Sequence, residues 1–147
     1  MKPEAGSDSL LFDKQICFPL YSAANAVVRA YKPLLKDLDI TYLQYMVLML
    51  LWEESNLNVK QLGERLRLDS GTLTPLLKRL DAKGLVTRNR SEIDERVRII
   101  RITKPGLALK AKARQIPEQL ACTIGLSTSK GREFKKLCEQ LLAALAD

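Results

Sequence analysis

The stretch Asn58-Val-Lys-Gln-Leu-Gly-Glu-Arg-Leu-Arg-Leu68-Asp-Ser-Gly-Thr-Leu-Thr-Pro-Leu-Leu-Lys-Arg-Leu80 decides the fold of this chain. Its leucines recur three or four positions apart, which indicates two short amphipathic helices. Between them stands Asp69-Ser-Gly-Thr72, made of residue types that cap helices and form turns. Pro75 is tolerated best in the first turn of a helix, so we expect the second helix to begin only a few residues before it and to reach about Lys83. The stretch predicts a helix-turn-helix.

Two strands are expected after this unit. Gly84 ends the second helix, and residues 85–90 and 96–103 combine β-branched and basic side chains around a polar turn at 91–95. We expect a β-hairpin wing, so that residues 58–103 form a winged helix-turn-helix DNA-binding region. The predicted fold class is mainly α with a small β-hairpin wing, a winged helix-turn-helix with N- and C-terminal dimerisation helices.

Helical patterns precede the winged region. Residues 13–36 carry apolar side chains at helical spacing, with Asp13 as the expected N-cap and Pro33 near the end. A second helix over 42–52 is apolar nearly all round, and we expect it to be the central buried helix.

Helical patterns also follow the wing. One helix is expected over 104–122 with a bend at Pro117, and another over 128–145 with an apolar stripe. No further core is available to cover the first and last helices. We therefore expect residues 10–36 and 105–147 to be dimerisation helices of a homodimer.

Composition sets the broad class. The 147 residues, 46% hydrophobic and 28% charged, suffice for one compact domain over 1–147. The start of the chain has no apolar signal core, and no stretch approaches the roughly 20 apolar residues of a membrane span, so we expect a cytoplasmic protein. Histidine is absent, and the three cysteines stand at spacings unlike a zinc site. Hydrolytic and metal-dependent functions are disfavoured, and we expect no enzyme, metal or cofactor.

The positive charge is concentrated in the winged region. The net charge is +7, and residues 60–104 hold twelve Lys or Arg against six Asp or Glu, a net of +6. Such a localised excess indicates an acidic partner. A solvated charged face is the alternative for an arbitrary basic stretch, but a helix-turn-helix within it favours DNA.

The second helix of the unit has the composition of a recognition helix. Thr72 and Thr74 can donate to phosphates or base edges, and cations follow them. In the wing, Asp94 stands two positions before Arg96 and can hold its guanidinium extended for a narrow minor groove. The alternatives are an ordinary helical hairpin and a solvent ion pair worth at most ~1 kcal/mol. The candidate DNA-binding residues are Ser70, Gly71, Thr72, Thr74, Pro75, Lys78, Arg79, Arg88, Arg90, Asp94, Arg96 and Arg98.

A cysteine near the N-terminus is the candidate sensor. Cys17 lies at the start of a helical segment, in Asp13-Lys-Gln-Ile-Cys-Phe-Pro-Leu-Tyr21, and Tyr31 and Tyr42 follow it. A thiol reacts as the thiolate, which helix N-termini and phenol hydroxyls favour. The plain alternatives are a small buried core residue for Cys17 and ordinary core packing for the two tyrosines.

Together these motifs resemble the MarR family of winged-helix repressors, and more closely its organic hydroperoxide resistance branch. Residues 68–80, 83–86 and 88–96 look like that family's recognition helix and wing, and Cys17-Phe-Pro-Leu-Tyr21 is the marker of the branch. The resemblance covers almost the whole chain. It implies a homodimer that binds a pseudo-palindromic operator, with half-sites about 34–36 Å apart, and represses a peroxidase gene.

The resemblance also implies how the signal is sensed. Cys17 is expected to be the peroxide-reactive thiolate, held by Tyr31 and Tyr42 in an apolar pocket at the dimer interface. Walls from Phe18, Leu20 and Met46 would favour organic hydroperoxides over hydrogen peroxide. Oxidation yields a sulfenic acid.

A second cysteine is expected to resolve the sulfenic acid. Some members of the family carry one near the start of the C-terminal helical pair, a place that Cys122 matches. The resemblance then implies an intersubunit disulfide between Cys17 and Cys122 that separates the recognition helices, whereas one-cysteine relatives react with small thiols. Cys138, on the apolar face of the last helix, is expected to be inert.

Two other functions stay open at this point. A MarR-type repressor that binds a phenolic or lipophilic ligand would share the fold and the DNA surface, with Cys17 incidental. A thiol peroxidase would use Cys17 in turnover, but only Lys14 offers a nearby cation and the basic centre would have no role. A peroxide sensor loses its response in Cys17→Ser, whereas a ligand-binding repressor keeps it. Steady peroxide consumption with a dithiol would indicate the thiol peroxidase.

Overall fold

The computed structural model describes residues 7–146. Residues 1–6, which carry most of the segment judged to lack a signal core, lie outside the described residues. The elements, in chain order, are the 3₁₀ helices η1 (Ser7–Leu10) and η2 (Phe12–Lys14), α1 (Cys17–Leu35), η3 (Lys36–Leu38), α2 (Tyr42–Glu53), β1 (Asn56–Asn58), α3 (Val59–Leu66), α4 (Ser70–Ala82), β2 (Val86–Arg90), β3 (Arg98–Ile102), α5 (Lys104–Ala113), α6 (Ile116–Ile124) and α7 (Thr128–Ala144).

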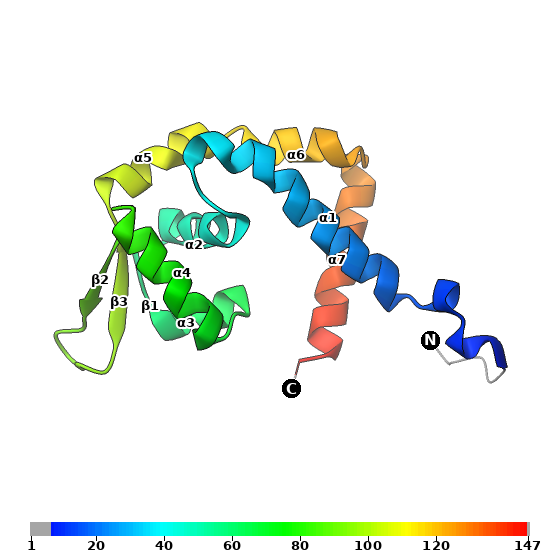
Figure 1. The fold of residues 1–147 in the computed structure, drawn as a ribbon, viewed down its shortest axis with the longest axis horizontal. Coiled ribbons are helices and arrows are strands. Elements are labelled where there is room, and N and C mark those ends of the chain that lie inside the picture. The colour runs from blue at the N-terminus through cyan, green and yellow to red at the C-terminus, as the bar shows by residue number, and fades with distance from the viewer. Residues whose placement is uncertain (1–6, 147) are drawn as a thin grey trace.

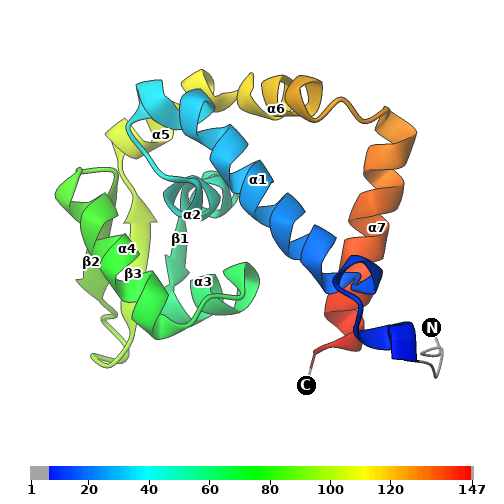
Figure 2. The ribbon, with the colours of Figure 1, turned by 45° about the vertical axis from the view of Figure 1, so that its right-hand side comes forward.

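The elements separate into a winged body and a set of long outer helices. Figure 1 shows α2, α3, α4 and the sheet gathered together, while α5 and α6 run along one side and α7 descends from the end of α6. The second view agrees that α7 and the start of α1 lie on the side remote from the sheet (Figure 2). The predicted fold class, mainly α with a small wing, is confirmed.

Side-chain caps set the two helices of the helix-turn-helix. Asn58 and Gln61 form a capping box at the start of α3, with N···O distances of 2.8 and 2.9 Å. Asp69 caps α4 by accepting from the Thr72 amide at 2.8 Å. Pro75 therefore lies in the second turn of α4 rather than the first, because the Asp69 cap sets the start at Ser70. The proline removes one helix hydrogen bond, a loss that the buried leucines of α4 offset.

The wing belongs to a three-stranded antiparallel sheet of order β1-β3-β2. Its hairpin strands are shorter than predicted, and Arg96 lies in the turn rather than on a strand. β1 was not predicted, since Asn56–Asn58 has only three residues, too few for an alternating pattern to stand out. Its central Leu57 is Cα-paired with Ile100 of β3, and both are buried in the core.

The core lies where α2 meets the winged region. Val47 and Leu48 of α2 and Ile100 of β3 are fully buried, so the predicted central position of α2 is confirmed. Gln44 is the buried polar residue found among the described residues, and it forms a capping box with Thr41 at 3.0 and 3.3 Å. Burial of each large apolar side chain contributes about 1.5–3 kcal/mol.

The start of α1 differs from the prediction. Asp13 was expected to cap this helix, but it lies in η2, and α1 begins only at Cys17 without a side-chain cap. The side chain of Gln15 donates instead to the carbonyls of Ser9 and Leu11 at 2.7 and 2.9 Å, which holds the chain in a turn before α1. Pro19 then falls in the first turn, where a missing amide hydrogen is tolerated.

The C-terminal helices are nearly as predicted, with one break. The helix expected over 104–122 with a bend at Pro117 is two helices, α5 and α6, and Pro117 lies in the first turn of α6. Ser127 caps α7 by accepting from the Lys130 amide at 3.4 Å. None of the residues of α7 with described burial is buried.

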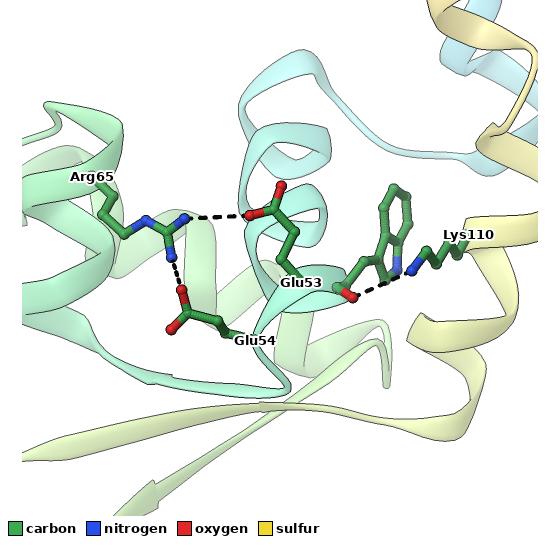
Figure 3. Close-up of polar contacts among 5 residues, drawn as sticks. Glu53, Glu54, Arg65 and Lys110 are labelled. Atoms are coloured by element: carbon green, nitrogen blue, oxygen red, sulfur yellow. Dashed lines mark hydrogen bonds and ion pairs between the residues drawn. The ribbon is translucent and has the colours of Figure 1, made fainter.

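Polar contacts join the end of α2 to helices on either side (Figure 3). Arg65 of α3 pairs with Glu53 at 3.4 Å and with Glu54, while Lys110 of α5 donates to the Trp52 carbonyl at 3.4 Å. These groups are partly solvent-exposed, so each ion pair contributes less than about 1 kcal/mol. These contacts orient α3 and α5 relative to α2, because both helices meet its last turn.

Candidate nucleic-acid interface and thiol site

One face of α4 is built for solvent and the other for the core. Leu73, Leu76, Leu77 and Leu80 are buried. The candidate residues on α4 are all exposed except Thr74, which is half-buried: Ser70, Gly71, Thr72, Thr74, Pro75, Lys78 and Arg79. The hydroxyl of Thr72 is held by Asp69, with 3.3 Å between Thr72 Oγ1 and Asp69 Oδ2.

The strand register sorts the wing arginines between two faces. Cα partners in β2 and β3 include Arg88 with Ile100, Arg90 with Arg98, and Thr87 with Arg101. Because paired residues share a face, Arg88, Arg90 and Arg98 lie on the side of the buried Ile100, whereas Arg101 lies on the other. These three candidate arginines thus lie on the face of the sheet that packs on α4.

A groove of about 400 Å³ lies between α4 and the wing. Its lining is Asn58, Val59, Lys60, Thr74, Leu77, Arg88, Arg96, Val97 and Arg98. Asn58 and Lys60 were missed from the sequence, because they belong to the start of α3 and only the pairing of β1 with β3 brings them beside the wing. The groove has an apolar floor and a basic rim.

The tip of the wing is a hydrogen-bonded turn. Asp94 Oδ1 accepts from the Arg96 amide at 3.0 Å and lies 3.5 Å from Arg96 Nε, so the predicted pair forms. The Ser91 hydroxyl accepts from the amides of Ile93 and Asp94 at 3.2 and 3.4 Å. The Arg96 side chain is 94% exposed, and the turn holds it out from the protein.

Most cationic side chains of this surface form no ion pair within the described residues. Among residues 7–146, the ion pairs include Lys60 with Glu64 and Arg96 with Asp94, and they leave out Lys78, Arg79, Arg88, Arg90 and Arg98. Unpaired cations on one face create the positive potential that attracts a phosphate backbone.

Cys17 is an exposed free thiol at the first position of α1. The ring of Phe18 lies 4.5 Å from that of Phe12, and Phe18, Leu20 and Tyr21 are also exposed. The N-terminus of a helix carries a partial positive charge, and Cys17 lies beside it. The buried-core alternative for Cys17 is thereby disfavoured within one chain. Met46, expected as a wall of the same pocket, is half-buried in α2.

Tyr31 and Tyr42 form a stacked pair. Their ring centroids are 4.5 Å apart, and Tyr45 lies 5.7 Å from Tyr31. Burial, with smaller contributions from Tyr42 and Tyr45, raises the pKa of Tyr31 to about 12, and burial also raises the pKa of Tyr42. Both phenols therefore stay neutral and keep a proton to donate. None of the hydrogen bonds found within residues 7–146 uses either hydroxyl.

Cys17 and the phenols of the same chain are far apart. Cys17 and Tyr31 are 14 positions apart on one helix, which corresponds to about 21 Å at ~1.5 Å per residue. Cys122 lies exposed near the end of α6, which both views place away from the start of α1 (Figures 1 and 2). Cys138 is half-buried, and all three cysteines are free. Within one chain Tyr31 and Tyr42 meet, but Cys17 and Cys122 join neither each other nor this pair.

The described part of the chain contains neither a membrane-spanning helix nor a cluster of metal ligands. No helix in residues 7–146 is both long enough and apolar enough to cross a membrane. Within the same residues, no three His, Cys, Asp or Glu side chains gather where they could hold a metal ion.

A helix-turn-helix and an adjoining hairpin that share a face of unpaired cations define a winged-helix DNA-binding protein. Residues 29–113 match the family described as transcriptional regulator SarA/Rot. The organic hydroperoxide resistance transcriptional regulator of Bacillus subtilis (strain 168) is 48% identical over 94% of this chain and 92% of its own length.

Solved structures include one relative in reduced, overoxidised and disulfide forms. Reduced AbfR of Staphylococcus epidermidis bound to DNA is similar with 32% identity and a TM-score of 0.79, covering 95% of this chain and 98% of that one. Disulfide-formed AbfR is 35% identical with a TM-score of 0.61, covering 94% and 92%. The chain belongs to the SarA/Rot family, within the MarR-type winged-helix regulators and their organic hydroperoxide resistance branch. It is a DNA-binding transcriptional regulator and not an enzyme.

Proposed function

We propose that this chain is a cytoplasmic homodimeric repressor that binds a pseudo-palindromic operator and releases it when an organic hydroperoxide oxidises Cys17. Residues 58–103 form the DNA-binding region, and 10–36 and 105–147 form the dimer. The observation that carries the proposal is the exposed thiol at the N-terminus of α1, set in apolar surface and about 21 Å along that helix from neutral phenols. A second subunit is the simplest means of joining them.

The exposed apolar surface supports a homodimer. Ile93 in the wing turn and Leu107 on α5 are exposed, but most of the exposed large apolar side chains belong to the segments at the two ends of the chain. They include Ile16, Phe18, Leu20, Tyr21, Ile124, Leu126, Phe134, Leu137, Leu141, Leu142 and Leu145. A 17-residue helix such as α7, with no buried residue, gains little stability alone. A second copy that covers α1 and α7 would bury this surface and hold two recognition helices at a fixed spacing.

In such a dimer the thiolate of one subunit accepts hydrogen bonds from Tyr31 and Tyr42 of the other. The thiolate attacks a hydroperoxide oxygen, so an S–O bond forms as the O–O bond breaks, and the alkoxide takes a proton and leaves as the alcohol. Cys17 becomes a sulfenic acid, so the phenols no longer face a negatively charged sulfur. The likeness to reduced, DNA-bound AbfR, greater than that to the disulfide form, supports assigning the present structure to the DNA-binding state.

We expect Cys122 to resolve the sulfenic acid between subunits. Its thiol attacks the sulfenic sulfur, forms the disulfide and releases water. After one equivalent of organic hydroperoxide, wild-type protein should migrate as a covalent dimer on a non-reducing gel. Cys122→Ser should remain monomeric there, and Cys138→Ser should behave as wild type. A covalent dimer in Cys122→Ser would show that this resolving role is wrong.

The wing offers a matched test of the DNA surface. We expect Arg98→Ala to weaken operator binding by roughly tenfold and to lower the salt slope by about 1, because Arg98 lines the groove beside α4. Arg101→Ala, on the opposite face of β3, should change affinity less than about threefold. Titrations at several salt concentrations measure both. Equal losses in the two variants would contradict the assigned face.

Oxidation of bound protein tests the proposed function directly. Labelled DNA from upstream of the gene should be bound by reduced protein and released after hydroperoxide. Release of the DNA by a phenolic acid that does not oxidise Cys17 would instead favour the ligand-responsive alternative.

A further inference from the structure

An aromatic row runs from the phenol pair to the far end of α2. Tyr31 stacks on Tyr42 and contacts Tyr45, and the rings of Tyr45 and Trp52 lie edge to face with centroids 6.1 Å apart. Tyr45 is 3% exposed, so it has no free space in which to absorb a shift of its neighbours. The proposed thiolate site is thus in packing contact with the sole tryptophan of the chain.

Trp52 ends this row at a main-chain hydrogen bond. Its Nε1 donates to the carbonyl of Gly106 at 3.0 Å, across 54 positions of sequence. Lys110, also on α5, donates to the Trp52 carbonyl at 3.4 Å, as Figure 3 shows. Trp52 therefore connects α2 to the first two turns of α5 through a side-chain and a main-chain group.

Gly106 lies at the base of the wing. Its amide donates to the Thr103 hydroxyl at 3.1 Å, and that hydroxyl donates to the Gly84 carbonyl at 2.6 Å. The Thr103 amide donates to the Leu85 carbonyl at 3.2 Å. Gly84 and Leu85 lead into β2, and Thr103 follows β3, so both strands of the wing are tied to this junction.

Gly106 is closely packed against the residues that flank the wing strands. A Cβ at Gly106 would lie 2.1 Å from the Leu85 carbonyl oxygen and 2.7 Å from Ile102 Cδ1. Close packing and the hydrogen bonds through Thr103 thus couple Gly106 to the ends of both wing strands. The hairpin that carries Asp94 and Arg96 begins and ends at these two strand ends, and β1 and α4 contact its strands further along.

We propose that Trp52 is the positioning residue through which the phenol pair sets the wing. The inference rests on the proposed function, in which Tyr31 and Tyr42 hold the partner's thiolate. Loss of that charge lets the stacked phenols move, Tyr45 passes the shift to Trp52, and the indole hydrogen bond passes it to Gly106. Tightly packed groups switch between discrete arrangements, so a small shift at one end relocates the wing tip.

The Trp52→Phe variant tests whether oxidation of Cys17 can be separated from release of the operator DNA. The variant keeps an aromatic ring against Tyr45 but has no N–H for Gly106. We expect Cys17 to be oxidised as in wild type, measured by mass spectrometry of the sulfenic acid or disulfide, and reduced protein to bind operator DNA within about threefold of wild type. The factor by which oxidation weakens DNA binding should fall by about threefold to tenfold, the value of one hydrogen bond.

Tyr45→Phe is the matched control, because its ring remains and its hydroxyl forms none of the hydrogen bonds found in residues 7–146. Its oxidation response should equal that of wild type. A Trp52→Phe protein that is oxidised normally and loses DNA by the full wild-type factor would overturn the proposal. If wild-type protein keeps its DNA although Cys17 is oxidised, the proposed function fails as well, and the two failures are distinguished by that measurement.

Tryptophan emission gives a readout that does not depend on a Trp52 variant folding. Because Trp52 is the one tryptophan, its emission reports this position alone. Oxidation of wild-type protein should red-shift or quench the emission, Cys17→Ser should show no change, and dithiothreitol should reverse the effect. An emission spectrum unaltered by complete oxidation of Cys17 would rule out Trp52 as the connection.

Discussion

Cys17→Ser is expected to bind operator DNA as tightly as reduced wild-type protein and to keep binding it after organic hydroperoxide is added. A serine hydroxyl is not a nucleophile toward the O–O bond and cannot form a sulfenic acid or a disulfide. In wild-type protein the affinity should fall at least about tenfold on oxidation, a loss of at least about 1.4 kcal/mol. Binding isotherms of reduced and oxidised protein give both numbers.

Cys138→Ser is the control for this variant. Cys138 lies half-buried on α7 and is expected to be inert, so its loss should leave the response intact. If Cys17→Ser released DNA with hydroperoxide as wild type does, a group other than Cys17 would be the sensor.

Gly106→Ala is expected to destabilise the fold by about 3 kcal/mol or more. The added Cβ would meet the Leu85 carbonyl oxygen at 2.1 Å, and main-chain atoms cannot turn aside as a flexible side chain can. At ~2–4 °C per kcal/mol for a domain of this size, the melting temperature should fall by roughly 10 °C. Thermal unfolding followed by circular dichroism measures it.

Gly131→Ala is the matched control, since no atom lies within 4 Å of a Cβ at Gly131 and the residue is in the interior of α7. Alanine is the better helix former by about 1 kcal/mol, so the melting temperature should stay unchanged or rise. A Gly106→Ala protein as stable as wild type would mean that β2 and α5 can separate, and the wing junction would not be rigid.

The winged helix was predictable because its signals are local. The spacing of the α4 leucines, the Asp69 cap and the turn between basic strands each occupy a few neighbouring positions. The prediction failed where distant segments decide the outcome. β1 exists only because Asn56–Asn58 pairs with β3, and that pairing brings Lys60 into the groove.

The candidate sensor was predictable in its residues but not in its arrangement. Cys17, Tyr31 and Tyr42 carry the right chemistry, yet a helix of 19 residues keeps the thiol from the phenols of its own chain. The cap at Asp13 was wrong because local hydrogen bonds of Gln15 hold a turn there. Trp52 gave no signal in the sequence, since its partner Gly106 is 54 positions away.

The most direct test of redox control is the anisotropy of labelled DNA from upstream of this protein's own gene. The DNA is titrated with reduced protein, then with protein treated with one equivalent of organic hydroperoxide, and finally with the same sample after dithiothreitol. The proposed function predicts tight binding, loss of binding and recovery, in that order. Tight binding that stays the same after complete oxidation of Cys17 would contradict it.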